Sequence, residues 1–545
     1  MSEHRSSTIE GKNAAGELGR PADTTARKGR GTPVQLFPFH PFLLAGASVL
    51  ALYANNVKEA SFLDVLPVLG AVLGFALLVF LGMGIILREF GARTGLLTTI
   101  VLIGCLFSVQ LASWVMALTG DMESWVARLV LALLLIALFV FIARTQLDLR
   151  LPHSLLNGIA LMMALTPIGQ VVWYKWQIPR PDPIVSSIGV PSTSTETRPD
   201  IVYLIFDRYA SARTLERYFG IDPLPMTTFL KERGFYVATG SHANYLKTGH
   251  SLASTFQMDY LDLLSEGDGR RSSDWGPIHA MLDEHRVARF VKSAGYRYVQ
   301  VGSWWSPTQD NPHADLNPQF GFREFASIYT RDIGLHPLMA VAAPETSYTR
   351  SLQWDYGQCQ RVPWQVEQIK KAVADEAGPS FVFGHILLPH EPFVFDPAGR
   401  CLSEEEANIR GRTAGYIDQV HYANKVIEDL VTTLQGSEKN PPIIILQGDE
   451  GPFPETDVGH ARSWQDATHD ELQIKMGILN AYYFPDHDYG TLYPSITPVN
   501  SFRILFNKYF DAQLSLLPDR IYGFPDIFRL YDFFEITHQV RSIED

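Results

Sequence analysis

Cysteine is scarce in this chain, with three residues among 545. Three cysteines are too few for a disulfide scaffold, and a chain of this length needs two or more folded units. Cys105 sits in an apolar run. Cys359 and Cys401 flank one segment of the later part, where they can pair if that part lies in an oxidising compartment or remain two free buried thiols.

Positive charge is also in short supply, because the formal net charge is -13. Most of the negative charge belongs to the later part of the chain, while nearly uncharged runs crowd the first third. This balance argues against nucleic acid as a partner. It fits a soluble domain that binds a metal ion or a neutral or zwitterionic substrate.

A convincing cleavable signal peptide is missing, because the first apolar run starts late and lacks a small-residue cleavage pattern behind it. Residues 1–32 are polar and basic without an apolar period, so we expect a disordered cytoplasmic tail. Five apolar runs follow within residues 33–175, each close to the roughly 20 residues that a bilayer span needs. These runs lie near Leu36–Tyr53, Phe62–Leu87, Leu96–Leu118, Trp125–Ala143 and Leu155–Val172.

Basic residues alternate between the loops that join these runs. The tail and the loops with Arg88 and Arg144 are basic, whereas the loops around Glu59 and Asp121 are poor in lysine and arginine. The positive-inside rule therefore predicts a cytoplasmic N-terminus, with the domain after the fifth span on the outer side of the membrane. Ionisable residues are nearly absent from the spans, which disfavours a transporter.

A Pro-, Ser- and Thr-rich stretch at 176–198 reads as a tether, and residues 199–545 then alternate between strand and helix patterns. The strand at Ile201–Phe206 ends at Asp207, and Ile443–Leu446 leads into Asp449 and Glu450. Such alternation predicts an α/β fold whose largely parallel sheet is covered by helices. Ligands in such folds bind at the carboxyl ends of the strands.

Carboxylates brought together at one sheet edge repel each other unless a divalent cation lies between them. An alcohol beside that cation becomes a better nucleophile, and Thr248 lies in a polar loop that runs into a helix start. Alone, each residue has a plainer interpretation. Asp207 can be a turn residue, Thr248 a helix cap, and His385 a core histidine.

The ordered set resembles a known family. Asp207 after its strand, Thr248-Gly-His-Ser251, Pro389-His390-Glu-Pro392 and Asp449-Glu450-Gly451 are similar to motifs of the sulfatase-like branch of the alkaline phosphatase superfamily. The layout resembles the membrane-anchored phosphoethanolamine and phosphoglycerol transferases. This resemblance implies an alkaline-phosphatase-like domain after a bundle of about five transmembrane helices.

The resemblance also implies roles for individual residues. It makes Thr248 the nucleophile and a metal ligand, together with Asp207, Asp449 and Glu450, and it makes His390 and His460 substrate-binding residues. Glu450 stands where the family usually has histidine, so an all-oxygen site would favour manganese, magnesium or calcium over zinc. The same substitution is also compatible with a degenerate site.

Thr248 lacks the neighbouring proline and arginine that sulfatases need to form formylglycine, which disfavours sulfate-ester hydrolysis. We therefore expect a metal-dependent phosphoester transferase or hydrolase that works through a covalent phospho-threonine. Its donor would be a membrane lipid or lipid-linked molecule, and its acceptor an envelope glycan or lipid. The alternative is a non-catalytic envelope-binding protein whose metal site is degenerate.

Overall fold

The computed structural model describes residues 37–119, 124–177, 198–331, 333, 345–375, 378–436, 441–459 and 461–541. The predicted tail and most of the predicted tether lie outside these residues. The domain boundaries drawn from the sequence therefore stay predictions. One helix crosses the predicted boundary between residues 175 and 176, because it continues to Gln177.

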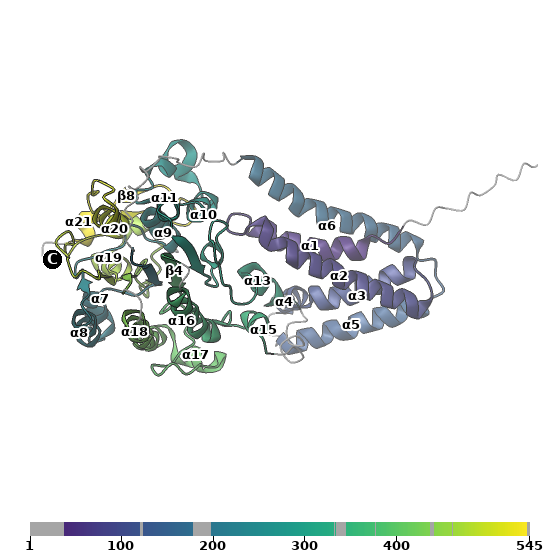
Figure 1. The fold of residues 1–545 in the computed structure, drawn as a ribbon. Helices are drawn as coiled ribbons and strands as arrows, with labels where there is room; N and C mark the ends of the chain where they lie inside the picture. The colour runs from purple at the N-terminus through teal and green to yellow at the C-terminus, as the bar shows by residue number, and fades with distance from the viewer. Residues whose placement is uncertain are drawn as a thin grey trace, which may run out of the picture. The chain divides into compact units, whose positions relative to one another are not determined.

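The described residues of the apolar first part of the chain form helices joined by short loops (Figure 1). Apolar residues all around these helices are typical of segments that face lipid or one another. The helices are α1 His40–Asn55, α2 Phe62–Leu87, α3 Ala92–Leu106, α4 Ser108–Thr119, α5 Ser124–Arg144 and α6 Arg150–Gln177.

The prediction of five membrane spans is too high. Within the described residues, three helices are long and apolar enough to cross a membrane: α2, α5 and α6. A fourth span exists only if α3 and α4, which meet at a bend of 71°, count as one. Helix α1 has 16 residues because it begins only at His40, after Pro38, and this is short of the roughly 20 that a span needs.

The helices at the start of this bundle meet through polar side chains. His40 in α1 lies 2.6 Å from the Thr99 hydroxyl of α3 and 3.2 Å from the His153 ring of α6. Asn157 of α6 accepts a hydrogen bond from the backbone of His40 at 2.9 Å. Buried polar groups need such partners, so these bonds tie the short first helix to its neighbours.

The second part of the chain is an α/β domain, as the sequence predicts. Its six-stranded sheet has the order β2-β6-β5-β1-β4-β3. Strands β5, β1, β4 and β3 are parallel, and β6 runs antiparallel to both β5 and β2. The strands are β1 Ile201–Phe206, β2 Tyr236–Val237, β3 Arg297–Val301, β4 Ser380–Ile386, β5 Ile443–Gln447 and β6 Asn480–Tyr483, with a separate pair β7 Tyr522–Gly523 and β8 Phe534–Glu535.

Helices cover both faces of this sheet (Figure 1). The α-helices are α7 Ala212–Phe219, α8 Leu224–Glu232, α9 Thr248–Gln257, α10 Gly276–Asp283, α11 Arg286–Ser293, α12 Ser306–Gln309, α13 Glu324–Arg331, α15 Ser347–Ser351, α16 Gln358–Ala374, α17 Glu404–Arg410, α18 Arg412–Gln435, α19 His469–Met476, α20 Ser501–Phe510 and α21 Thr537–Val540. Short 3₁₀ turns lie at Asp262–Ser265, Gly267–Arg271, Trp464–Asp466 and Pro498–Asn500.

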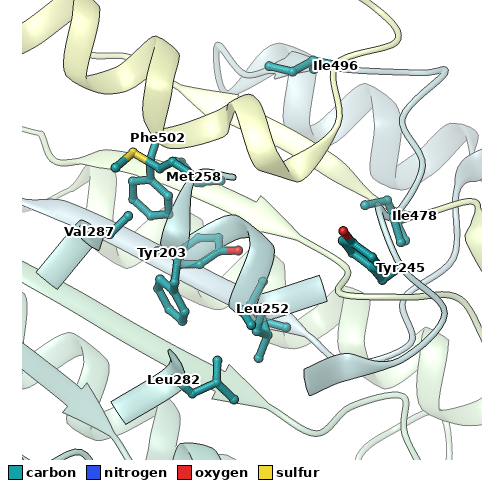
Figure 2. Close-up of a cluster of buried hydrophobic side chains, with 14 of the residues drawn as sticks. Tyr203, Tyr245, Leu252, Met258, Leu282, Val287, Ile478, Ile496 and Phe502 are labelled. Atoms are coloured by element: carbon teal, nitrogen blue, oxygen red, sulfur yellow. The ribbon is translucent and has the colours of Figure 1, made fainter. Parts of the chain in front are cut away.

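Alternation along the central strands builds the two cores. In β1, Tyr203 points into the core shared with α9, α11 and α20, whereas Leu204 points into the core shared with α16 and α18. Figure 2 shows the first core, where Tyr203 lies beside Phe502 and Leu252. Every residue of β1 and β5 is buried, as expected for strands covered on both faces.

A disulfide joins Cys359, in the first turn of α16, to Cys401 in the loop before α17. It closes a segment of 42 residues that includes β4. Cross-linking a segment of this length removes conformational freedom from the unfolded chain. The bond therefore ties the loop after β4 to the helix that packs on that strand.

We predict that Cys401→Ser lowers the free energy of unfolding by about 3 kcal/mol, because the unfolded chain regains the freedom that the disulfide removes. Thermal unfolding of the detergent-solubilised protein under non-reducing conditions measures this as a lower midpoint. Cys105→Ser is the control, since Cys105 is a free thiol. Equal midpoints for the two variants would contradict the prediction.

Candidate active site

Three side chains meet where the central parallel strands end. Strands β4 and β5 pair with β1 on its two sides, so their carboxyl ends lie at the same sheet edge. Asp207 follows β1 directly, His385 is the penultimate residue of β4, and Asp449 follows β5 after one glycine. The parallel register therefore explains how Asp207 reaches His385, 178 positions away, and also Asp449.

Asp207, His385 and Asp449 form a group that could hold a metal ion, because one ligand atom from each lies within 4.8 Å of the others. His385 Nε2 lies 3.1 Å from Asp207 Oδ2, and its Nδ1 lies 2.8 Å from the Thr308 hydroxyl. A second partner of this kind fixes the ring orientation of a ligating histidine.

The unpaired atoms of this group fit a cation. Asp207 Oδ1 and Asp449 Oδ2 are buried without a hydrogen-bond partner among the described residues. Burial, together with the negative charges of Asp207 and Glu450, raises the pKa of Asp449 well above its usual range. A divalent cation would offset the cost of burying these negative charges, because it would neutralise the carboxylates. It would also bind the two oxygens that lack a hydrogen-bond partner.

Thr248 stands beside this group as the first residue of α9. Its side chain lies close enough to Asp449 to oppose the rise in the pKa of that carboxyl group. Because Thr248 opens a helix of ten residues, the backbone N–H groups of the first turn point toward the same place. A negatively charged group bound there would be stabilised by the helix dipole.

Arg208 links the acids at this edge. Its backbone N–H donates to Asp449 Oδ1 at 3.0 Å, and its guanidinium lies 3.4 Å from Glu450 and 3.3 Å from Glu391. Its φ of 63° is left-handed, which a residue with a side chain adopts only when its surroundings compensate. The bond to Asp449 provides that compensation, and it aims the side chain of Arg208 at the carboxylates.

Glu450 is held by a buried lysine. Lys475 Nζ, in α19, lies 2.8 Å from Glu450 Oε1, and both side chains are about fully buried, at 0% and 1% exposure. A methyl group added at Gly451 would collide with the Ile474 carbonyl, so only glycine lets this turn pack against α19. Glu450 Oε2 has no hydrogen-bond partner among the described residues, so its ligation of a metal stays a prediction.

Three cations surround one aromatic ring next to these acids. The charged groups of Arg208, Lys247 and Lys475 lie 4.8, 4.2 and 3.6 Å from the centre of the Phe453 ring. Such contacts stabilise cations that are partly removed from water. The site thus combines a carboxylate-rich side, suited to a metal ion, with a cationic side, suited to an anionic group.

A cavity of about 230 Å³ opens onto this arrangement. Asp207, Thr248 and His390 line it, and their roles in one site stay a prediction. Burial and the charge of Arg208 lower the pKa of His390, which keeps its ring neutral. The remaining lining residues are Glu59, Arg208, Lys247, Gly249, Trp275, His279, Trp304, Trp305, Ser306, Pro307, Glu324, Leu387 and Glu450.

The predicted substrate-binding residue His460 lies outside the described residues. His250 is fully buried, with Nε2 3.1 Å from the Leu530 carbonyl and its ring among aromatic side chains, so it does not face solvent. His385 and Lys475 were not predicted as site residues, because each lies in a segment whose apolar neighbours indicate a buried core position.

The presence of His385 changes which metal ions suit the site. The predicted ligands all offer oxygen, whereas the group in the structure includes an imidazole nitrogen. Nitrogen ligands suit zinc and other transition metals as well as manganese. The structure therefore supports a divalent cation without selecting one, and the preference for manganese, magnesium or calcium stays a prediction.

One comparison with known proteins identifies the family. The sulfatase family model matches residues 199–502. A search among characterised proteins finds no significant sequence match.

Solved structures with similar folds include the integral membrane lipooligosaccharide phosphoethanolamine transferase A from Neisseria meningitidis, at 12% identity and a TM-score of 0.40, which covers 87% of this chain and 94% of that one. The periplasmic domain of EptC from Escherichia coli in complex with Zn matches at 11% identity and a TM-score of 0.38, and the match covers 60% of this chain and 90% of that one. The putative sulfatase YidJ from Bacteroides fragilis matches at 14% identity and a TM-score of 0.35, and the match covers 60% of this chain and 77% of that one. These TM-scores are too low to support any conclusion about this chain.

We predict that Lys475→Met lowers the free energy of unfolding by about 3 kcal/mol, because it leaves the buried Glu450 carboxylate without its closest cation. The double variant with Glu450→Gln should recover part of this loss. Lys508→Met is the matched control, since Lys508 pairs with two exposed carboxylates and should cost about 1 kcal/mol or less. Thermal or denaturant unfolding compares the variants, and equal losses at the two lysines would contradict the prediction.

Glu324 should make stability fall as the pH rises. Burial, with the charges of Glu59 and Asp64, raises the pKa of Glu324 from 4.5 to about 7 in the folded protein. The folded state therefore holds a proton that the unfolded state has lost between these two values, so folding becomes less favourable across this window.

We expect Glu324→Gln to remove this pH dependence, so that its thermal midpoint exceeds that of the unsubstituted protein above about pH 7. Midpoints measured from pH 4 to 8 test this. Glu404→Gln, at an exposed side chain of α17, serves as the control. Parallel curves for Glu324→Gln and the unsubstituted protein would refute the assignment.

Proposed function

We propose that this chain, which belongs to the sulfatase family, is a metal-dependent enzyme that cleaves or transfers a phosphoester at a membrane surface. The observation that carries the proposal is the meeting of Thr248 with Asp207, His385 and Asp449 at one sheet edge. A nucleophile, a set of ligands and a cationic wall in one cavity are the parts that such a reaction needs.

Asp207, His385 and Asp449 would hold the divalent cation, with Thr248 and Glu450 as further candidates. The chemistry that such a cation supplies when bound is a lower pKa for a nearby alcohol and compensation for charge on a transferred group. Two unpartnered carboxylate oxygens support this part of the proposal. The manganese, magnesium or calcium preference belongs to it as well, and metal analysis of the purified protein decides it.

Thr248 is the proposed nucleophile. Its oxygen would attack phosphorus, forming a covalent phospho-threonine while the bond between phosphorus and the leaving oxygen breaks. Arg208 and Lys247 line the cavity, where their charges would bind the non-bridging oxygens of the phosphoryl group. The N-terminal N–H groups of α9 would add to this stabilisation as charge develops.

His390 is the proposed acid–base group on the substrate side. Its neutral ring can take the proton of Thr248 and pass it to the leaving oxygen, and can then take the proton of the acceptor hydroxyl and return it to the Thr248 oxygen. The acceptor then attacks the phospho-threonine and releases Thr248. A sugar or lipid hydroxyl as acceptor gives head-group transfer, and water gives phosphodiester hydrolysis. His460 stays a second candidate for contact with the substrate.

The apolar helices support a membrane location and a lipid-linked donor, because a site tied to a bilayer meets head groups at high effective concentration. The acceptor would be an envelope glycan or lipid. A cytoplasmic N-terminus and an outward-facing α/β domain in the bacterial inner membrane belong to the proposal. This orientation requires an odd number of crossings, which three spans satisfy and four do not.

The test uses the full chain in detergent, with bis(4-nitrophenyl) phosphate as the probe and metal content measured in parallel. Thr248→Ala should lower turnover at least about a thousandfold while metal is retained, because it removes the nucleophile and leaves Asp207, His385 and Asp449 in place. His385→Ala should lower both metal content and turnover. Thr255→Ala is the matched control, since Thr255 lies in the same helix and bonds the Ser251 carbonyl away from the cavity.

Two results would overturn the proposal. Turnover by Thr248→Ala equal to that of Thr255→Ala would exclude Thr248 as the nucleophile. A well-folded protein without any bound divalent cation, and without turnover when manganese, magnesium, calcium or zinc is supplied, would favour the non-catalytic envelope-binding alternative.

A further inference from the structure

A second polar cavity of about 560 Å³ lies elsewhere on the α/β domain. It shares no lining residue with the cavity at Thr248. Arg213 and Arg541 line it, and none of the described lining residues is acidic. Two guanidinium groups therefore lie in the wall of one cavity, where they can attract an anion.

Arg541 is only partly satisfied in this cavity. Its Nη2 donates to the Ser495 carbonyl at 2.9 Å, while its Nε is buried without a hydrogen-bond partner among the described residues. A buried guanidinium N–H without an acceptor is costly, and an anion in the cavity could accept a hydrogen bond from this group.

His242 responds to the same charges. Its ring is buried at the cavity wall, with Nδ1 3.1 Å from the Gly240 carbonyl. Burial lowers the pKa of His242 to about 4, and the positive charges of Arg541 and Arg213 contribute to this shift. The two guanidinium groups therefore act on a neutral ring, and their positive charge dominates this part of the wall.

The N-terminus of helix α7 adds to the positive electrostatic potential of this cavity. Ser211, which also lines the cavity, is the N-cap of α7, a helix of eight residues, and its hydroxyl accepts from the Thr214 N–H. The positive end of the helix dipole thus lies on the same side as Arg213. Thr239 and Gln473 supply further polar groups to the wall.

We propose that this cavity binds a phosphate or sulfate group carried on a hydroxyl-bearing body such as a sugar. Arg213 and Arg541 hold the anion, because guanidinium groups match the geometry of tetrahedral oxyanions. The cavity is in the size range of small-molecule sites, so it leaves room for the attached body beside the polar wall. The site is separate from Thr248 and does not depend on the chemistry proposed there.

Calorimetric titration of the full chain in detergent tests the site, with inorganic phosphate and glucose 1-phosphate as probes. Arg213→Ala combined with Arg541→Ala should weaken glucose 1-phosphate binding at least about tenfold, because two charged hydrogen-bond donors are lost. Arg217→Ala is the matched control: it removes the same charge from the same helix, at a residue that lies 3.5 Å from Asp470 and does not line the cavity.

Arg213 is exposed, so Arg213→Ala alone should fold and should show a smaller loss of the same kind. Repeating the titration in the Thr248→Ala background separates this site from the catalytic proposal, because binding here should be unaffected. Unchanged affinity in the double variant, or an equal loss in Arg217→Ala, would overturn the assignment. Glucose 1-phosphate that binds no more tightly than inorganic phosphate would contradict the hydroxyl-bearing body.

Discussion

Compensation among buried charges at the carboxyl edge of the sheet is the constraint on which the site depends. Asp207, Asp449 and Glu450 are each at most 2% exposed, and ionised groups are rarely buried unless they are paired. Lys475 and Arg208 pair with Glu450 and reach toward the others, but they leave Asp207 and Asp449 with open oxygens. A metal ion is the partner that would complete this balance.

The same constraint brings opposite charges together in the cavity wall. Asp207 and Glu450, which follow β1 and β5, line the cavity together with Arg208 and Lys247. Thr248 lines the same cavity, at the start of a helix whose dipole favours negative charge. A substrate anion would therefore be drawn to the position where the threonine oxygen can reach it.

Sequence patterns were enough to predict the α/β fold and the edge at which the site forms. Asp207 and Asp449 follow strands of apolar, β-branched residues, and the parallel arrangement of those strands brings the two acids together. Strand limits were slightly less accurate, because the strand expected at Ile443–Leu446 continues to Gln447. Helix α1 showed a similar limit, since an apolar run does not reveal where its first helical turn begins.

His385 and Lys475 could not be found in the same way. His385 is surrounded in sequence by strand residues, and its contact with Asp207 depends on the pairing of β4 with β1 across 178 positions. Lys475 likewise meets Glu450 only because α19 packs against the turn after β5. Glu450 looks like a metal ligand when its neighbours in space are unknown, whereas the structure gives it a buried lysine as its closest partner.

The most direct test of this account is the mass of the peptide that contains Thr248, measured after the metal-loaded enzyme is quenched during turnover of a phosphodiester. The account predicts an added phosphoryl group, with or without its head group, on Thr248 and none in Thr248→Ala. Turnover without any adduct on Thr248, or with the adduct on another residue, would contradict it.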